Sequence, residues 1–443
     1  MAEADVNSVL QTVASAITPN EKDELKIEEA KKIIFNRLAH ISSDFVPELE
    51  GSVAKGTWLA QSPELDVFLL FPKSVSRNYM ENRIIEVAKT VLRKWQISYA
   101  EHPYVKGKVL GVSVDLVPCY RVSSPSEMQS AVDRTPFHTR FINEHLTAEQ
   151  KQDVRLLKAF FKGIGVYGAE IKVRGFSGYA SEVLIYRFGN LAKLLREASQ
   201  WRGKVNLGWD GEPEALGLPD PVDEKRNVTA SVSLKSLSTF IAAAGFFLRF
   251  PSETFFWSKG FVGQDLNGIL VLKTGKPNGV EDVLWGEIWK ASSAIQKYMG
   301  TLGFEIWDSS AFADEQNVFF FYLLQSHERP PSTLVLGPPV HMSDNALNFI
   351  KKWINDSSVL RGPWIHDGRW ALVRSFGGSS ESLLREGLDR DLGSLGLGEF
   401  EAEFKNGYEI RVGKRTLSLS RKKSYRQALA WFSSSRPGWL SAL

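Results

Sequence analysis

The apolar positions of this chain first form a continuous run at Val67 to Phe71, within the sequence ELDVFLLFP. The run is rich in β-branched and aromatic residues, and Ser62-Pro63 and Pro72 bound it, which is typical of a buried strand. Glu64 and Asp66 open this segment, and residues two apart in a strand project from the same face. The pattern therefore predicts a buried strand with two carboxylates side by side at its start.

Alternating apolar and polar positions predict a second strand in residues 108–117. We expect another extended segment at residues 99–103, with the connection near Gly107. Asp115 lies in the middle of the second strand, where a lone Asp is costly to bury. It either faces solvent on an edge strand or belongs to a polar site. One face of this strand carries Val112, Val114 and Leu116, and the other carries Ser113, Asp115 and Val117.

Helical patterns dominate the middle of the chain. Thr147 and Gln150 match a capping box, which predicts a helix that ends at Gly163. Thr135 and Pro136 predict the N-cap and first residue of another helix, whose first turn would hold His138 within reach of an anion. Further helices are predicted over residues 27–39, 179–188, 191–199 and 234–248.

Beyond Pro251 the pattern changes to strands at 268–272, 304–307 and 317–324 with a helix at 280–299. This β-α-β-β order suggests a small α/β sandwich. A break at Gly337 to Pro339 precedes a helix over 344–354 and a strand over 368–375. We therefore predict an α+β multidomain protein, with a mixed-sheet domain in residues 1–140, a helical central domain in 141–258, and a C-terminal α/β and tail region in 259–443.

The residues before the first strand favour an anion-binding turn. Gly51 permits a tight turn, and residues 52–59 can begin a helix whose free N–H groups face an anion. The Ser52 hydroxyl and the Lys55 ammonium would add a donor and a charge. The neighbouring carboxylate pair suits a divalent cation such as Mg²⁺. Together the two halves indicate nucleoside triphosphate chemistry, whereas a carboxylate pair alone is also common on solvated strand ends.

Cationic residues are concentrated in two parts of the sequence. Arg155, Lys158 and Lys162 share one face of the helix after Thr147, a face that is otherwise simply solvated. From Lys405 onward, nine Lys or Arg accompany a single acid, with Trp and Tyr residues interleaved. This stretch is either a solvated basic tail or a surface for an RNA backbone, formed by Arg411, Lys414, Arg415, Arg421, Lys422 and Lys423.

Composition excludes several classes of protein. The 443 residues, 43% of them apolar and 24% charged, suit about three soluble domains of about 150 residues each. No apolar run approaches the roughly 18 to 20 residues that span a membrane. The single Cys119 excludes an intramolecular disulfide and fits a reducing compartment, and seven scattered histidines give no zinc-ligand spacing. We expect a cytoplasmic protein.

The Gly-Ser turn joined to Glu-x-Asp resembles the signature of the DNA polymerase beta nucleotidyltransferase superfamily. A longer series, including GSVAKGTWL, ELDVFLLFP, VDLVPCY, AVDRTPFH, LLKAFFKGIGVYGAE and DPVDEKRNV, resembles the archaeal-type, class I CCA-adding enzymes. The resemblance is strongest from Gly51 to about Asn227 and weaker as far as Trp370. It implies that residues 1–140 are a nucleotidyltransferase catalytic domain.

The resemblance also implies roles for individual residues. Glu64, Asp66 and Asp115 match the ligands of two Mg²⁺ ions. Ser52 and Lys55 match the phosphate site, where many members have Arg in place of the lysine. A lysine keeps the charge but loses the bidentate fork. The remaining nucleotide-contacting positions match His138, Lys158, Tyr167 and Arg226, the last of them in the pocket that selects the base.

We therefore predict template-independent addition and repair of the 3′-terminal CCA of tRNA from CTP and ATP by a homodimer. Two alternatives differ in specificity or class. One is a poly(A)-type or C-only polymerase, and the other is a non-catalytic RNA-binding relative. The presence of all three carboxylates argues against the non-catalytic reading.

Overall fold

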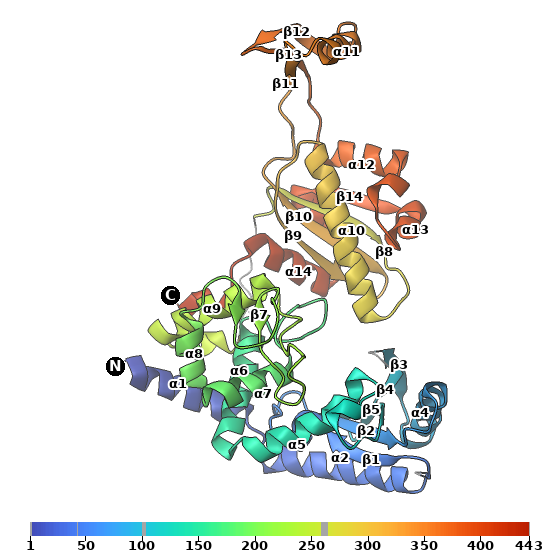
Figure 1. The fold of residues 1–443 in the computed structure, drawn as a ribbon, viewed down its shortest axis with the longest axis vertical. Coiled ribbons are helices and arrows are strands. Elements are labelled where there is room, and N and C mark those ends of the chain that lie inside the picture. The colour runs from blue at the N-terminus through green and yellow to red at the C-terminus, as the bar shows by residue number, and fades with distance from the viewer. Residues whose placement is uncertain (1, 42, 100–102, 258–264, 443) are drawn as a thin grey trace. The chain divides into compact units, whose positions relative to one another are not determined.

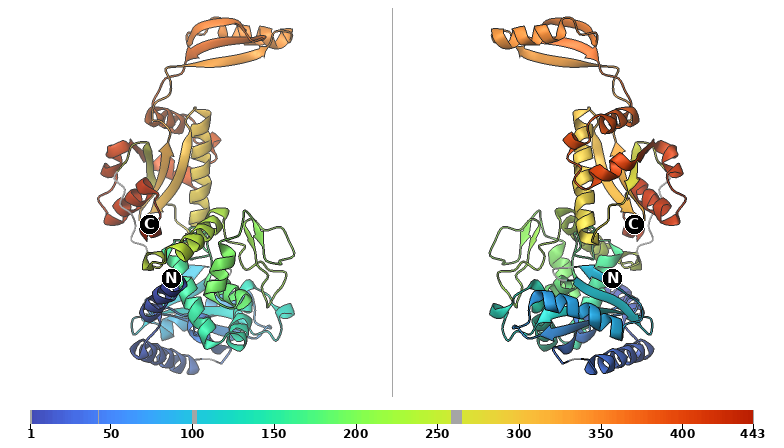
Figure 2. Two further views of the ribbon diagram at one scale, coloured as in Figure 1. Left: turned by 90° about the vertical axis from the view of Figure 1, so that its left-hand side faces the viewer. Right: turned by 90° about the vertical axis from the view of Figure 1, so that its right-hand side faces the viewer.

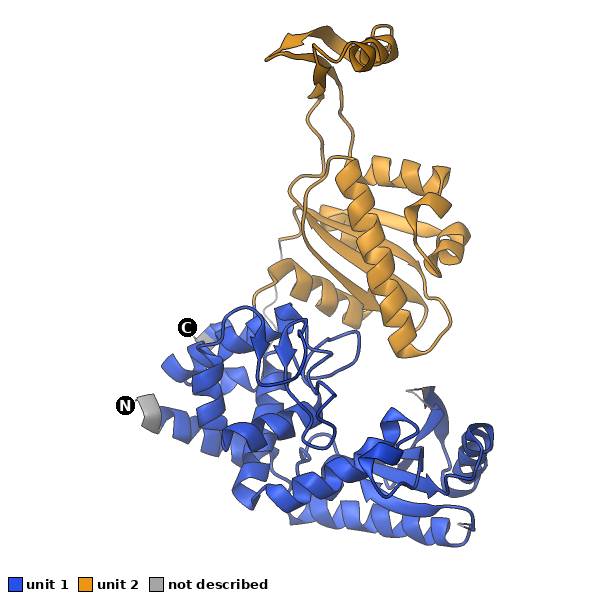
Figure 3. Ribbon diagram, in the orientation of Figure 1, with its two compact units in different colours: residues 1–260, 437–443 blue, residues 261–436 orange. Residues whose placement is uncertain are grey.

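The computed structural model describes residues 2–41, 43–99, 103–257 and 265–442. The chain forms two compact units (Figure 3): residues 1–260 with 437–443, and residues 261–436. The predicted boundary at residue 258 lies outside the described residues. The described helices include none that is long and apolar enough to cross a membrane. Each unit is described separately below.

A five-stranded sheet of order β1-β2-β5-β4-β3 forms the first layer of unit 1 (Figure 1). β2 and β5 are parallel, and the other neighbouring pairs are antiparallel. Leu65, Val67 and Leu69 of β2 pack against two helices, α2 and α4, which cover one face. The bounds are β1 Val46–Glu50, β2 Glu64–Phe71, β3 Trp95–Tyr99, β4 Pro103–Val109, β5 Val112–Tyr120, α2 Glu21–Ala39 and α4 Arg77–Val91.

The predicted strand of residues 64–71 and the alternation around Asp115 are confirmed, but the connection near Gly107 is wrong. Gly107 lies inside β4, and the chain turns at Leu110 and Gly111, which both have positive φ. The glycine at this position serves packing and does not mark a bend, because a Cβ on Gly107 would press on Leu92. Residues 100–102 of the predicted segment 99–103 lie outside the described residues.

A second core in unit 1 is helical and includes Phe160, Phe240 and Phe247. The capping box of α6 is confirmed: Thr147 Oγ1 accepts from Gln150 N at 3.3 Å and Gln150 Oε1 from Thr147 N at 3.0 Å. Thr135 is not an N-cap, because the preceding Arg134 is already helical and takes that position. The helices are α1 Ala2–Ile17, α5 Thr135–His145, α6 Ala148–Gly163, α7 Gly178–Phe188, α8 Leu191–Ala198 and α9 Leu234–Arg249.

Unit 2 contains a four-stranded sheet of order β14-β8-β10-β9, with helix α10 along one face (Figure 2). The predicted β-α-β-β order is confirmed, and the chain then adds β14 to the free edge of β8. Helices α12 and α13 share the face of α10. The bounds are β8 Ile269–Gly275, α10 Glu281–Thr301, β9 Ile306–Ala313, β10 Asn317–Leu324, α12 Ser380–Arg390, α13 Phe400–Asn406 and β14 Tyr408–Val412.

A smaller three-stranded sheet of order β11-β13-β12 also belongs to unit 2. The predicted break at Gly337 to Pro339 coincides with the end of the edge strand β11, where the register with β13 shifts and a proline needs no partner for its nitrogen. The bounds are β11 Ser332–Pro339, α11 Ser343–Trp353, β12 Val359–His366 and β13 Arg369–Ser375.

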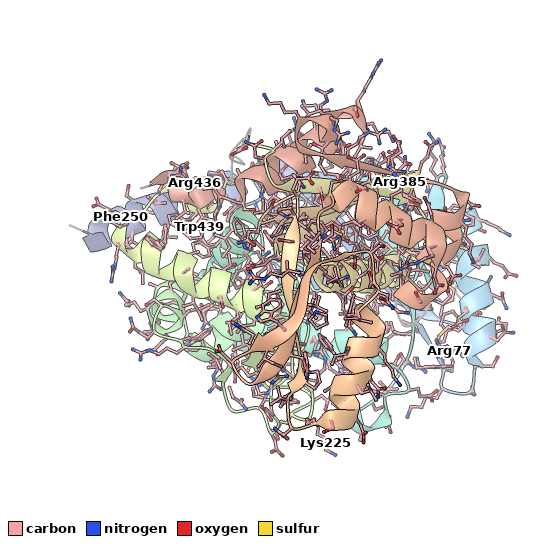
Figure 4. The ribbon with its side chains drawn as sticks, turned by 90° about the horizontal axis from the view of Figure 1, so that it is seen from above. Arg77, Lys225, Phe250, Arg385, Arg436 and Trp439 are labelled. Carbon is pink, nitrogen blue, oxygen red and sulfur yellow. The ribbon has the colours of Figure 1, made fainter. Side chains whose placement is uncertain are left out.

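The C-terminal stretch is folded rather than a free tail. Helix α14, Lys423–Ser434, buries Tyr425, Leu429 and Phe432 on the second face of the four-stranded sheet. From Pro437 onward the chain belongs to unit 1. There Trp439, labelled in Figure 4, stacks on Phe255 with ring centroids 5.4 Å apart.

Candidate functional site

The three predicted metal ligands lie on one face of the five-stranded sheet, opposite the face covered by α2 and α4. β2 and β5 pair in parallel so that Asp66 is directly opposite Asp115, and Glu64 is opposite Ser113. Neighbouring strands are about 4.8 Å apart, so the two aspartates are adjacent. Glu64 precedes Asp66 by two residues and therefore shares its face.

The electrostatics of this face favour a bound cation. Burial, together with the charges of Glu64 and Asp115, raises the pKa of Asp66 to about 7. Burial and the charge of Glu64 likewise raise the pKa of Asp115 to about 6. Lys106 Nζ lies 3.4 Å from Asp115 Oδ2, while Oδ1 is buried with no hydrogen-bond partner among the described residues.

An orphaned carboxylate oxygen in a cluster of acids fits a hard divalent ion, which takes oxygen ligands. In the described part of the chain, no three potential ligand side chains already converge as a closed metal site. Holding an ion would therefore require side-chain rotations of the carboxylates. The fold supplies the positions, and Lys106 compensates only part of the negative charge.

Gly51 brings the turn after β1 against the carboxylates. Its φ is +70°, and an added Cβ would lie 1.7 Å from Asp66 Oδ2, so only glycine fits here. The predicted helix over residues 52–59 is shorter, because α3 (Gly51–Lys55) ends at Gly56 in the left-handed conformation. Ser52 lies in this short helix, one residue from the glycine that contacts Asp66.

The two lysines predicted to bind phosphate meet at Glu182, a fully buried residue of α7. Lys55 Nζ lies 2.5 Å from Glu182 Oε2, and Lys158 Nζ lies 3.1 Å from Oε1. Thr57 donates its hydroxyl to Glu182 Oε1 at 2.6 Å. Burial raises the pKa of Glu182, but Lys55 and Lys158 outweigh burial and bring the pKa down to about 2.

The basic face predicted on α6 is only partly solvated, since Lys162 is exposed but the other two residues contact the protein. Lys158 is 3% exposed. Arg155 donates to the carbonyl oxygens of Gly56 and Trp58 at 2.7 and 3.1 Å. Lys162 donates to Ser62 Oγ at 3.0 Å. The face therefore holds the loop that runs from α3 to β2.

Tyr167 adjoins the lysine cluster. Both the Tyr167 hydroxyl and Lys158 Nζ lie close to Gly178, at the start of α7. A Cβ added to Gly178 would lie 3.1 Å from the hydroxyl and 3.6 Å from Nζ. Burial, together with the charges of Glu182, Glu170, Glu64 and Asp66, raises the pKa of Tyr167 above its usual range. The phenol is therefore a neutral hydrogen-bonding group.

His138 and Arg226 meet at a second buried carboxylate, Asp220. His138 Nε2 lies 2.9 Å from Asp220 Oδ2, and Arg226 Nη1 lies 2.8 Å from the same oxygen. Tyr179 donates its hydroxyl to Asp220 Oδ1 at 2.9 Å. The His138 ring stacks on the Tyr179 ring with centroids 3.7 Å apart.

Sequence reasoning missed both carboxylates, although each carried a signal. Glu182 is the only acid in an otherwise largely apolar helix, and a buried acid needs cationic or hydrogen-bonding partners. Asp220 opens the DPVDEKRNV segment, which drew attention only to Arg226. Their partners could not be read from the chain, because Lys55 and Glu182 are 127 positions apart.

The six basic residues predicted to bind RNA lie in unit 2, and half of them have acidic partners. Arg411 pairs with Glu409, Arg415 with Glu381, and Lys422 with Asp314 and Glu315. The other three are Lys414, Arg421 and Lys423, which are exposed and form no salt bridge to another described residue.

Comparison with known families defines the class of the protein. Residues 31–138 match the nucleotidyltransferase domain, and residues 152–257 match the second domain of tRNA nucleotidyltransferases. Residues 267–413 match the C-terminal domain of CCA-adding enzymes. The protein is thus a nucleotidyltransferase by its matched domains.

The relatives narrow this class further. The CCA-adding enzyme of Saccharolobus islandicus is 41% identical over 364 residues, covering 79% of this chain and 87% of the relative. That of Sulfolobus acidocaldarius is 36% identical over 366 residues, covering 80% and 86%. A solved structure of the Cid1 poly(U) polymerase aligns with 56% of this chain and 97% of its own at 15% identity and a TM-score of 0.46. The chain belongs to the family of CCA-adding enzymes.

Proposed function

We propose that this protein builds and repairs the 3′-terminal CCA of tRNA from CTP and ATP without a template, releasing pyrophosphate. The observation that carries the proposal is the pairing of Asp66 with Asp115 beside the Gly51-Ser52 turn. Membership of the CCA-adding family supplies the substrate class. One site can serve both nucleotides because CTP and ATP carry the same triphosphate.

Ser52, Lys55, Lys158 and Tyr167 would bind the triphosphate. The lysine cluster supports this role because two ammonium groups share one carboxylate, Glu182, and keep a net positive charge. A triphosphate can therefore be bound without removing the internal ion pairs. His138 and Arg226 would contact the nucleoside, with Arg226 reading the base edge.

Glu64, Asp66 and Asp115 would hold two Mg²⁺ ions. When bound, the ions supply positive charge to the attacking 3′-hydroxyl and to the phosphate oxygens. The carboxylates must be ionised for this, so their raised pKa values couple activity to pH. Gly51 keeps the turn close enough for the phosphates and the carboxylates to share one space.

The tRNA is proposed to bind through its acceptor arm, whose A-form helix is read by shape and backbone charge. Lys414, Arg421 and Lys423 suit this role better than their three neighbours that have acidic partners. We further propose that the protein works as a homodimer in the cytoplasm.

The test is incorporation of labelled nucleotides into tRNA transcripts that end before the CCA, after the first C, or after the second C. CTP alone should add only C, ATP alone should extend only the transcript that ends in CC, and both together should complete CCA. Long A tails would indicate a poly(A)-type enzyme, and addition of C without A a C-only enzyme. No metal-dependent incorporation by the folded protein would refute the proposal.

A further inference from the structure

We propose that Asp220 is a positioning residue for nucleotide selection: it orients Arg226 toward the base and fixes the tautomer of His138, leaving Nδ1 as a hydrogen-bond acceptor. The inference deepens the proposed function and rests on it. Asp220 itself touches no nucleotide in this scheme and acts through its two neighbours.

Asp220 joins three segments of the chain. The residue is fully buried and accepts four hydrogen bonds. Two come from its own loop, from Val222 N to Oδ1 at 3.0 Å and from Arg226. The other two come from Tyr179 on α7 and from His138 on α5.

The ionisation states decide which nitrogen of His138 carries the proton. Burial raises the pKa of Asp220, but His138, the Val222 N–H and Arg226 outweigh it, so the pKa falls below the usual range. Burial lowers the pKa of His138 in spite of Asp220. A neutral imidazole beside an ionised carboxylate must donate from Nε2, so Nδ1 has no proton.

Nδ1 forms no hydrogen bond with the described residues. A bare Nδ1 suits a ligand that donates, such as a ribose hydroxyl or a base amino group, and does not suit a phosphate oxygen. His138 is only slightly exposed and stacks on Tyr179, so its ring cannot turn freely to exchange the two nitrogens. The orientation of the acceptor is thus set before a nucleotide binds.

Arg226 is held on one side only. Its Nη1 is bound to Asp220, and the side chain keeps about a third of its surface exposed. It also lines a cavity of about 490 Å³ together with Ser177, Asn227 and Ser231. The anchor at Nη1 restricts the guanidinium, and its remaining donors stay available for a base edge.

The experiment compares Asp220→Asn with wild type at the first C-addition step. Asn keeps the shape but removes the charge and can donate to His138, so either tautomer is allowed. We expect the ratio of kcat/KM for CTP to that for UTP to fall by at least about tenfold, the effect of one charge-assisted hydrogen bond. D220N should cost less selectivity in the R226A background than in wild type, because only the part of its effect that acts through His138 then remains.

A spectroscopic arm does not depend on activity. The ¹⁵N shifts of labelled histidine, assigned with a His138→Gln variant, should show protonation at Nε2 in wild type and a shift toward Nδ1 in D220N. Asp153→Asn is the matched control. Asp153 is a partly buried carboxylate that accepts from Leu191 N at 3.2 Å, and its loss should leave both readouts unchanged.

Three results would overturn the proposal: a CTP-to-UTP ratio within about twofold of wild type, equal slowing of both nucleotides with a lower melting temperature, or an unchanged tautomer. If D220N does not fold, Tyr179→Phe removes one donor to Asp220 and keeps the ring. A smaller loss of selectivity, about threefold, is then expected, and none would contradict the proposal. Absence of any incorporation by wild type would instead refute the proposed function.

Discussion

Replacing Glu182 with Gln should destabilise unit 1 strongly while changing the shape of one side chain very little. Glu182 is fully buried and is the shared partner of Lys55 and Lys158, which are 7% and 3% exposed. The substitution leaves two nearly buried ammonium groups with only neutral partners at this position. Such groups retain the cost of desolvation without the compensating attraction.

The magnitude follows from the pKa of Glu182. Its folded value of about 2 lies below the usual 4.5, and a difference of about 2.5 units corresponds to about 3 kcal/mol. Removing one partner of a buried ion pair independently costs about 3–5 kcal/mol. Because the folded pKa is depressed, this stabilisation is present above about pH 4.5 and is lost as the pH falls toward about 2.

Urea unfolding at neutral pH should therefore show a loss of about 3 kcal/mol in E182Q, a loss that shrinks below about pH 4.5. CTP should raise the melting temperature of E182Q more than that of wild type, because the triphosphate replaces the missing negative charge. Glu214→Gln, which breaks an exposed pair with Arg174, should cost less than about 1 kcal/mol. A loss below about 1 kcal/mol in E182Q, without pH dependence, would refute the reasoning.

Four further outcomes are expected. Asp66→Ala and Asp115→Ala should each abolish addition of both C and A with tRNA affinity retained, and activity within about tenfold of wild type would contradict their role. Gly51→Ala should reduce metal-dependent activity because its Cβ would meet Asp66, whereas Gly189→Ala, with φ of +83° and no atom within 4 Å, imposes backbone strain alone. Mg²⁺ should raise the melting temperature less at about pH 5.5 than at about pH 8, because Asp66 and Asp115, whose pKa values are raised, take up protons as the pH falls. Neutralising Lys414, Arg421 and Lys423 should flatten the slope of log tRNA affinity against log salt by up to about 0.9 per lost contact, with CTP affinity unchanged. An unchanged slope would mean that these three residues are only solvated and do not contact tRNA.

Local signals in the sequence predicted local structure well. The capping box at Thr147 is confirmed, and the strand over residues 317–324 has the predicted bounds. Both depend on residues within one element, where hydrogen bonding or apolar pattern acts at short range. The alternation around Asp115 also placed that carboxylate on the correct face, because a strand offers only two faces.

Features that depend on distant segments were not predictable. The basic C-terminal stretch looks like a tail in sequence, yet Ile410 and Tyr425 are buried on opposite faces of the four-stranded sheet of unit 2. Truncation at Arg411 would thus remove part of β14 as well as charge, so substitution is the better test. Likewise, the burial of Lys158 depends on Glu182, which a helical wheel of α6 alone cannot show.

The four buried or half-buried acids of unit 1 that matter here separate into two kinds, and the separation explains where a cofactor is needed. Asp66 and Asp115 have raised pKa values because burial and neighbouring acids outweigh the nearby lysines. Glu182 and Asp220 have lowered pKa values because cations and hydrogen-bond donors outweigh the effect of burial. The chain therefore satisfies the carboxylates that hold its own lysines and arginine, and it leaves the pair on the sheet without sufficient positive charge. Among the described acids, this pair lies beside Glu64 on one face of the sheet, and that concentration of negative charge favours an external cation there.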